Sequence, residues 1–276
     1  MEEVAAVAGE GPCLMCGDLD NPTVEHIIPQ TLWNRFGIDP DREDLAVFRT
    51  TLCGRHNDAT SVLHERTEMM ELIDTGEPVT PTTLQHLSDW ALWVTLLLGL
   101  ARGSGVLGPE VSRELLLRRF DGGDGRGARG VRVYAARVLE YVDPALPAIT
   151  PYMLALHRDT SVVLDPRDRP TGFTVGEGPI NASESIGLGR VALLVVGRTY
   201  TSGPGHNDKL DQAAAQVGLE RIHPLPAPLP TLTPRPVSMK DISSLFTVMP
   251  FGADLSLMPA DINAMWASAT DDEQGR

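Results

Sequence analysis

Apolar side chains recur along the chain in two spacings, one typical of helices and one typical of strands. Val62, Met69 and Ile73 are interleaved with charged residues, and we predict one amphipathic helix over 57–73. The run 84–101 is apolar almost all round, which is typical of a helix buried in a core. Both segments are therefore predicted helices, one at the surface and one inside.

Beyond residue 105 the pattern mixes helices with strands. We predict a helix over 109–120 and a strand over 131–142, and the aliphatic run 191–196 is the strongest candidate for a buried strand. Weaker signals predict strands at 161–164 and 172–175, a turn at 187–189, a helix at 207–217, an extended proline-rich stretch at 223–236, and short helices at 238–248 and 259–267. The sequence therefore predicts an α+β fold.

The clearest break in the pattern lies near residue 80. Asp74-Thr75-Gly76-Glu77-Pro78 favours a turn, and Thr80-Pro81 favours a helix start, because Thr can cap a first turn and Pro fits its first position. We therefore predict three parts: a disordered N-terminus over 1–12, a small module over 13–80, and an α+β domain over 81–276 that serves substrate recognition or oligomerisation.

All three cysteines, Cys13, Cys16 and Cys53, lie in the first fifth of the chain. An odd number of clustered cysteines argues against a disulfide framework and indicates a metal site. The N-terminus Met1-Glu2-Glu3-Val4 lacks the basic start and apolar run of an export signal. The longest apolar stretch, 90–101, would span about 18 Å as a helix, well short of a ~30 Å bilayer core. We therefore expect a cytoplasmic protein that does not enter a membrane.

Two residues separate Cys13 from Cys16, and two separate Cys53 from His56. The first spacing places two thiolates on one side of a tight turn, at a reach that suits tetrahedral Zn²⁺, and the second pair supplies a third thiolate and an imidazole. A Cys₃His set closes the coordination sphere, which is typical of a structural zinc site. The alternative is three buried cysteines and a surface histidine without an ion.

An acid–histidine pair, Glu25-His26, lies between these half-sites and is followed by Ile27-Ile28-Pro29. Two apolar residues after such a pair predict a strand that leaves a site, with successive side chains on opposite faces. Asp44-Leu45 and Leu52-Cys53-Gly54-Arg55-His56-Asn57 follow. Together these motifs resemble the HNH endonuclease family, whose pattern is CxxC, an acid–His–Ile–x–Pro signature, a polar residue before Leu, and LCxxCN. The resemblance covers 13–64, under a fifth of the chain.

The resemblance implies a ββα-metal fold, in which a two-stranded hairpin and a helix hold one catalytic divalent ion. By this resemblance Glu25 and Asn57 are ligands of that ion and His26 is the general base. Asp44 takes the place of the family's middle Asn and braces the loop that orients His26. Two residues depart from the commoner pattern, because His56 replaces a Cys and Glu25 replaces an Asp.

Two of these assignments have open alternatives. Asp41, Glu43 and Asp44 are close together in the sequence, and any of them could simply be solvated. His64 follows Asn57 by seven residues, which is nearly two helical turns and places both on about the same face. His64 is therefore a candidate contact for the catalytic metal or the phosphate, and otherwise an ordinary surface residue.

The implied roles suit phosphodiester hydrolysis. A histidine with a pKa of about 6.5 can take a proton from water at neutral pH. A hard divalent ion, Mg²⁺ or Mn²⁺, held by Glu and Asn oxygens stabilises the leaving 3′-oxygen and the pentavalent transition state. The zinc has no open position, so it does no chemistry and replaces a core too small to fold by itself.

Charge limits how well this chain can bind nucleic acid. The formal net charge is −14, of which −11 belongs to residues 1–82, whereas duplex binding depends on a basic surface that displaces counterions. The most basic stretch could supply phosphate contacts or could be a solvated helix and loop; it contains Arg113, Arg118, Arg119, Arg126, Arg129, Arg132 and Arg137. We interpret the isolated His157, His206 and His223 as structural.

Two hypotheses follow for the function. The first is a metal-dependent endonuclease that cleaves DNA in preference to RNA, in defence or mobile-element biology, with activity that depends on the second domain, on homo-oligomerisation or on a protein partner. The second is a zinc-stapled interaction module without catalytic activity, which the negative charge of the module favours.

Overall fold

The computed structural model describes the protein in segments that leave several loops and both ends aside. They are residues 11–35, 39, 41, 48–64, 66–101, 109–120, 131–142, 155–158, 161–164, 170–174, 181–198, 211–212 and 214–244. Nearly all of the N-terminus predicted to be disordered, and the whole predicted helix 259–267, lie outside these residues. Within them, no helix is both long enough and apolar enough to cross a membrane.

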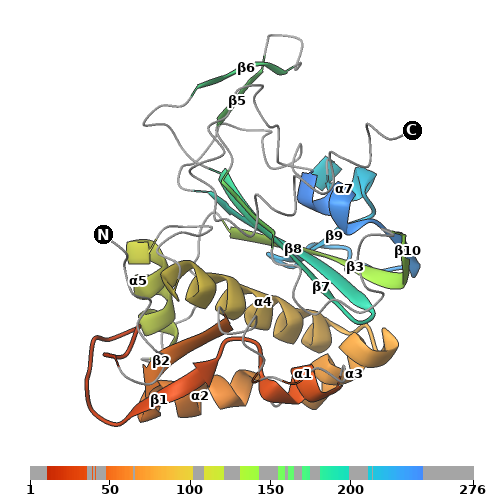
Figure 1. Ribbon diagram of the computed structural model, residues 1–276. Helices are drawn as coiled ribbons and strands as arrows, with labels where there is room; N and C mark the ends of the chain where they lie inside the picture. Colours follow the sequence, from red (N-terminus) through yellow and green to blue (C-terminus); the bar gives the residue numbers. More distant parts are fainter. Residues whose placement is uncertain are drawn as a thin grey trace.

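The N-terminal part is an antiparallel pair of strands followed directly by a helix (Figure 1). Strand β1 (Pro22–His26) pairs with β2 (Arg49–Cys53) along its whole length. The short helix α1 (Gln30–Arg35) lies between them in the sequence, and α2 (Gly54–His64) begins at the residue after β2. Because α2 contacts both strands, the three elements form a small ββα unit.

Three further helices complete the helical part: α3 (Thr67–Thr75), α4 (Pro81–Ala101) and α5 (Pro109–Phe120). The start of α4 is capped reciprocally. The backbone N–H of Thr83 donates to Thr80 Oγ1 over 3.1 Å, and the backbone N–H of Thr80 donates to Thr83 Oγ1 over 2.7 Å. With Pro81 at the first position, this cap confirms the predicted helix start, and the predicted bounds of α5 are also confirmed.

The single helix predicted over 57–73 is wrong, because the structure has two helices there. Arg66 separates α2 from α3 in an extended conformation with φ −73° and ψ 100°. Leu63 on α2 and Leu72 on α3 both belong to the core that contains α4. The break allows each helix to turn its own apolar side towards that core, which one straight helix could not do.

A six-stranded sheet forms the second half of the fold. Its strand order is β10-β3-β8-β7-β4, and β9 also pairs with β3. All neighbours are antiparallel except β10 with β3. The bounds are β3 (Val131–Tyr141), β4 (Ala155–Arg158), β7 (Asn181–Leu188), β8 (Val191–Arg198), β9 (Glu220–His223) and β10 (Arg235–Val237). A separate antiparallel pair consists of β5 (Ser161–Leu164) and β6 (Pro170–Thr174), and α7 (Met239–Ser244) follows β10.

The continuous apolar run in β8 is explained by burial on both faces of this sheet. Leu193 and Val195 belong to the core cluster that contains α4, whereas Leu194 and Val196 belong to a second cluster with Met239 of α7. Side chains alternate between faces with a period of two, so a strand covered on both sides has no polar positions. This arrangement confirms the predicted buried strand.

Strand β7 was missed because its sequence, Asn181 to Leu188, is rich in small and polar residues. It forms because all eight residues pair with β8 and because Ile186 and Leu188 enter the core. The turn predicted at 187–189 therefore begins too early, since residues 187 and 188 belong to the strand and the turn consists of residues 189 and 190.

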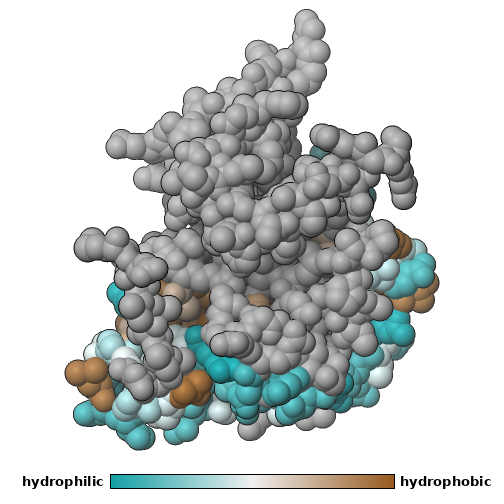
Figure 2. Space-filling view, in the orientation of Figure 1, coloured by the Kyte–Doolittle hydropathy of each residue, from teal (hydrophilic) through white to brown (hydrophobic). Residues whose placement is uncertain are grey.

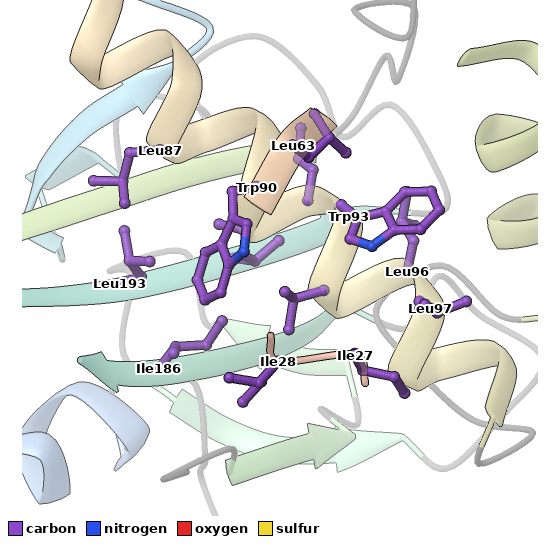
Figure 3. Packing of buried hydrophobic residues seen from close by; sticks show 14 of the residues in the cluster. Ile27, Ile28, Leu63, Leu87, Trp90, Trp93, Leu96, Leu97, Ile186 and Leu193 are labelled. Carbon is purple, nitrogen blue, oxygen red and sulfur yellow. The ribbon is translucent and has the colours of Figure 1, made fainter. Parts of the chain in front are cut away.

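Helix α4 is the centre of the described structure. It contacts α2, α3 and α5 on the helical side and β3, β8 and β9 of the sheet. Figure 3 shows Trp90 and Trp93 of this helix among Ile27 and Ile28 from the N-terminal part and Leu193 from the sheet. One buried cluster thus runs across the boundary at residue 80 that the sequence pattern indicated, and the division into two domains stays a prediction.

Gly189 at the turn between β7 and β8 gives a first testable prediction. Its φ is +54°, and a Cβ at this position would lie 2.4 Å from the carbonyl oxygen of Ile73 in α3. We expect Gly189→Ala to lower the unfolding free energy by at least about 1–3 kcal/mol, the usual cost of a strained backbone conformation. Thermal melting measures the loss, and Gly11→Ala is the control, since a Cβ there would meet nothing within 4 Å. Equal melting temperatures for the two variants would contradict the close contact between the turn and α3.

Candidate functional site

The first two cysteines lie in a tight turn that precedes β1. The backbone N–H of Cys13 donates to the carbonyl of Asp18, and that of Gly17 donates to the carbonyl of Cys13, each over 2.7 Å. Gly17 has a φ of +77°, a conformation that favours glycine. The backbone N–H of Leu14 donates to Thr51 of β2 over 2.9 Å, so the turn is attached to the strand that carries the other half of the cluster.

The four predicted zinc ligands converge. The ligand atoms of Cys13, Cys16, Cys53 and His56 all lie within 4.8 Å of one another. His56 Nδ1 is 3.3 Å from Cys13 Sγ and 3.2 Å from Cys53 Sγ, and the Sγ atoms of Cys16 and Cys53 are 3.9 Å apart. A tetrahedral ion with Zn–S bonds of about 2.3 Å places its sulfurs about 3.8 Å apart, whereas a disulfide needs about 2 Å.

These distances and the chemistry of the donors fit a structural metal such as zinc. Cys13, Cys53 and His56 are buried, and Cys16 is exposed beside an open depression. Cys53 is the last residue of β2, and His56 lies in the first turn of α2. One ion bound by the four ligands would therefore join the N-terminal turn, the strand and the helix. The predicted Cys₃His group is therefore present as a group that could hold a metal.

The thiols differ in their readiness to lose a proton. Burial alone would raise the pKa of Cys13, but hydrogen bonds from backbone N–H groups of Cys16, Cys53 and Met15 lower it below its usual value. The pKa of Cys16 is raised to about 11 by desolvation and by the neighbouring Cys13. Metal binding requires thiolates, so an ion entering this cluster displaces a proton from Cys16.

Glu25 lies on the buried side of β1, opposite Thr50 of β2, and is 6 % exposed. Its Oε1 atom is 3.4 Å from Nε2 of His64, which is also buried, in the last turn of α2. The indole N–H of Trp90 in α4 donates to His64 Nδ1 over 3.1 Å. A carboxylate, an imidazole and an indole from three elements thus form one buried chain of contacts.

His26 points to the other side of β1, because successive side chains of a strand alternate. The side-chain amide of Gln30 donates to His26 Nε2 over 3.3 Å, and Asp41 Oδ1 lies 4.0 Å from the same nitrogen. Burial lowers the pKa of His26 below 6.5, and the charge of Arg49 lowers it further against the opposing effect of Asp41. The imidazole is therefore mainly neutral at pH 7 and can accept a proton.

The strand expected to leave the site after Glu25-His26 is not present, because β1 ends at His26. Ile27 and Ile28 do not alternate between faces, since both are fully buried in the core, and α1 begins two residues later. Glu25 and His26 are thus the last two residues of the strand, and the buried side chains of Ile27 and Ile28 fix the backbone that follows them.

The remaining predicted site residues are placed as follows. Asn57 is half-buried in the first turn of α2, and His64 is buried and thus not the surface residue that the alternative interpretation assumed. Among the residues that the structure describes, Asp41 is the acid placed near His26. Asp44, His206, Arg126 and Arg129 lie outside the described residues, whereas His157 lies in β4 and His223 in β9.

Two of the arginines for which the sequence left phosphate contact or solvation open are engaged by carboxylates. Arg132 donates to Asp211 over 2.5 Å, and Arg137 donates to Glu77 over 2.5 Å. Asp211 also accepts from Arg221 over 2.7 Å. These pairs favour a structural role for Arg132 and Arg137 over phosphate binding.

Sequence reasoning missed Gln30 and Trp90 as neighbours of the candidate catalytic residues. Gln30 follows His26 by four residues, which was an available signal, whereas Trp90 is distant in sequence and its apolar neighbours indicated only a core helix.

No protein-family model, curated protein or solved structure matches this chain.

Proposed function

We propose that this protein is a metal-dependent endonuclease of the HNH type that hydrolyses phosphodiester bonds, with DNA as the favoured substrate. The observation that carries the proposal is a ββα unit whose strand pair and helix meet at a Cys₃His group, with a buried acid and a proton-accepting histidine at consecutive positions of β1. This is the arrangement that the resemblance to HNH endonucleases implies.

In this proposal Glu25 and Asn57 hold a divalent ion, Mg²⁺ or Mn²⁺. Glu25 supplies a buried carboxylate from β1, and Asn57 supplies an amide oxygen from α2, two elements that contact each other. Oxygen donors of this kind suit a hard cation, which when bound supplies charge neutralisation at the phosphate. His26 accepts the proton of the attacking water, and Gln30 and Asp41 orient its ring.

The zinc would be structural in this proposal, and the ion held by Glu25 would be separate from it. Within the part of the chain that the structure describes, the ligand atoms of three or more Cys, His, Asp or Glu residues come close enough together to hold an ion at the Cys₃His group. Glu25 and His64 form a pair apart from that set. Elemental analysis of the purified protein should therefore find about one tightly held zinc for each chain.

A panel of nucleic acids tests the reaction. The zinc-loaded, full-length protein is incubated with supercoiled plasmid, linear duplex, single-stranded DNA and RNA, with Mn²⁺, with Mg²⁺ or without added ion. We expect nicking of plasmid that depends on the added ion. Because an acidic module makes few Lys or Arg contacts with phosphate, we expect the nicking rate to depend only weakly on salt. Absence of hydrolysis on every substrate at low salt with saturating Mn²⁺ would contradict the proposal.

A zinc-stapled interaction module without catalysis is the second candidate function. The net charge of −11 over residues 1–82 favours it, because such a surface repels phosphate. The described part of the face shown in Figure 2 is largely hydrophilic with separate apolar spots, which fits a polar contact surface better than an apolar one. Saturation of the Glu25 site by Mn²⁺ discriminates the two functions, since the interaction module needs no second ion.

A further inference from the structure

The chain of contacts from Trp90 through His64 to Glu25 assigns a role to His64 that differs from metal binding. We propose that His64 is a positioning residue that holds the Glu25 carboxylate, and that Trp90 of α4 holds His64 in the required tautomer. This inference rests on the proposed function, because Glu25 is taken as a ligand of the catalytic ion.

The tautomer follows from the donor at one end of the chain. An indole N–H can only donate, so His64 Nδ1, which lies 3.1 Å from it, must be the acceptor. The proton of the neutral ring is then on Nε2, the nitrogen that faces Glu25 Oε1 at 3.4 Å. An Nε2–H group donates to a carboxylate and has no lone pair for a metal ion. While Trp90 makes this contact, His64 can orient Glu25 but cannot ligate the same ion.

The side chains of Trp90, His64 and Glu25 are buried, which restricts their movement. Trp90 is fully buried, and the side chains of His64 and Glu25 are 9 % and 8 % exposed. Trp90 lies in the same core cluster as Leu193 and Ile186 of the sheet (Figure 3). The position of the Glu25 carboxylate is thus tied, through two hydrogen bonds, to a helix packed on the C-terminal sheet. Residues beyond 80 therefore contribute to the site, and their sheet acts as its scaffold.

Residue 64 offers a variant that separates positioning from ligation. In His64→Gln, the amide oxygen can accept from Trp90 and the amide nitrogen can donate to Glu25, so both contacts have a replacement. In His64→Ala, neither contact remains. A positioning role predicts that Gln preserves the site and Ala damages it, whereas a metal-ligating role predicts that both variants lose the imidazole ligand and weaken ion binding.

Trp90→Phe tests the same point from the other end. Phenylalanine keeps an aromatic ring in the core but removes the N–H donor, so His64 is released to carry its proton on Nδ1. The positioning role predicts weaker ion binding in this variant, because Glu25 loses its oriented donor. A ligating His64 predicts equal or tighter binding, because the released Nε2 lone pair faces the ion.

The experiment uses the full-length, zinc-loaded protein and Mn²⁺ as the probe. Nitrogen-15 spectra of the histidine side chains report the tautomer of His64, assigned by comparison with His64→Gln. Electron paramagnetic resonance reports the Kd for Mn²⁺ without any need for catalysis, and plasmid nicking gives the rate at saturating Mn²⁺.

We expect an Nε2–H tautomer in the unsubstituted protein, and a Kd raised about 10- to 100-fold in His64→Ala, the usual effect of losing a partner that orients a metal ligand. For His64→Gln we expect a Kd within about threefold of the unsubstituted value, and for Trp90→Phe an increase of about 10-fold.

Any result that differs from these expectations contradicts the positioning role of His64, the endonuclease proposal, or both. An Nδ1–H tautomer, equal losses in His64→Ala and His64→Gln, or a Kd for Mn²⁺ that does not respond to residue 64 would overturn the positioning role even if DNA is cleaved. If His64→Ala lowers the melting temperature but leaves the Kd for Mn²⁺ unchanged, the contacts of Trp90, His64 and Glu25 serve stability alone, and the positioning role is overturned. The expected order of Kd values in a protein that cleaves no nucleic acid would contradict the endonuclease and keep the positioning role in ion binding. Absence of Mn²⁺ binding would contradict both.

Discussion

Cys53→Ser is expected to abolish zinc binding and to unfold the ββα unit within the full-length protein. Cys53 is 6 % exposed and is the last residue of β2, directly before α2, so its thiolate would tie the strand and the helix to the same ion. Structural zinc contributes apparent binding free energies of about 10–16 kcal/mol in small zinc-binding peptides, as much as the whole stability of an ordinary domain. Loss of the ion removes the link between the N-terminal turn, β2 and α2.

The measurements are elemental zinc content, thermal melting and amide hydrogen exchange across β1 and β2. We expect zinc to fall from about one equivalent to none, and the exchange protection of both strands to be lost. Asp58→Asn is the matched control, because this exposed residue lies in α2 close to the cluster without a ligand atom in it. Retention of a full zinc equivalent and of strand protection in Cys53→Ser would show that the cluster does not hold the unit together.

His26→Ala is expected to lower the rate of plasmid nicking by about 10²–10⁴-fold, the usual contribution of a general base. The imidazole is mainly neutral at pH 7, because burial and the charge of Arg49 lower its pKa, so a ring nitrogen can take up a proton. The backbone pairing of residue 26 with Arg49 does not depend on its side chain. The variant should therefore fold, bind zinc and bind Mn²⁺ as the unsubstituted protein does.

His86→Ala is a matched control for this experiment. His86 in α4 is also partly buried, and its pKa is also lowered, by burial first and by the charge of Arg66 second, but it is not one of the residues assigned to the proposed site. We expect its nicking rate to stay within about twofold of the unsubstituted protein, as for a substitution outside the reacting groups. Nicking that persists unchanged in His26→Ala would remove this histidine from the reaction.

Local pattern was sufficient for the elements whose own residues decide their structure. The cap and proline at Thr80-Pro81 specify the start of α4, and the aliphatic run from Val191 specifies a strand buried on both faces. The Cys₃His group was also predictable, because ligand type and spacing within each half already restrict the geometry. The ββα order of β1, β2 and α2 agrees with what the resemblance to HNH endonucleases implies.

Tertiary structure alone decided the rest, because the deciding partners are far apart in the chain. The polar strand β7 exists because β8 pairs with it, and the break at Arg66 exists because α2 and α3 pack separately on the core. Glu25 meets His64 across 39 residues and His64 meets Trp90 across another 26, a relation that no local period encodes. The sequence by itself determined which residue types could bind a metal or accept a proton. Only the packing of α4 against both the ββα unit and the sheet determined which of them contact one another, since such contacts depend on the free energy of the whole core.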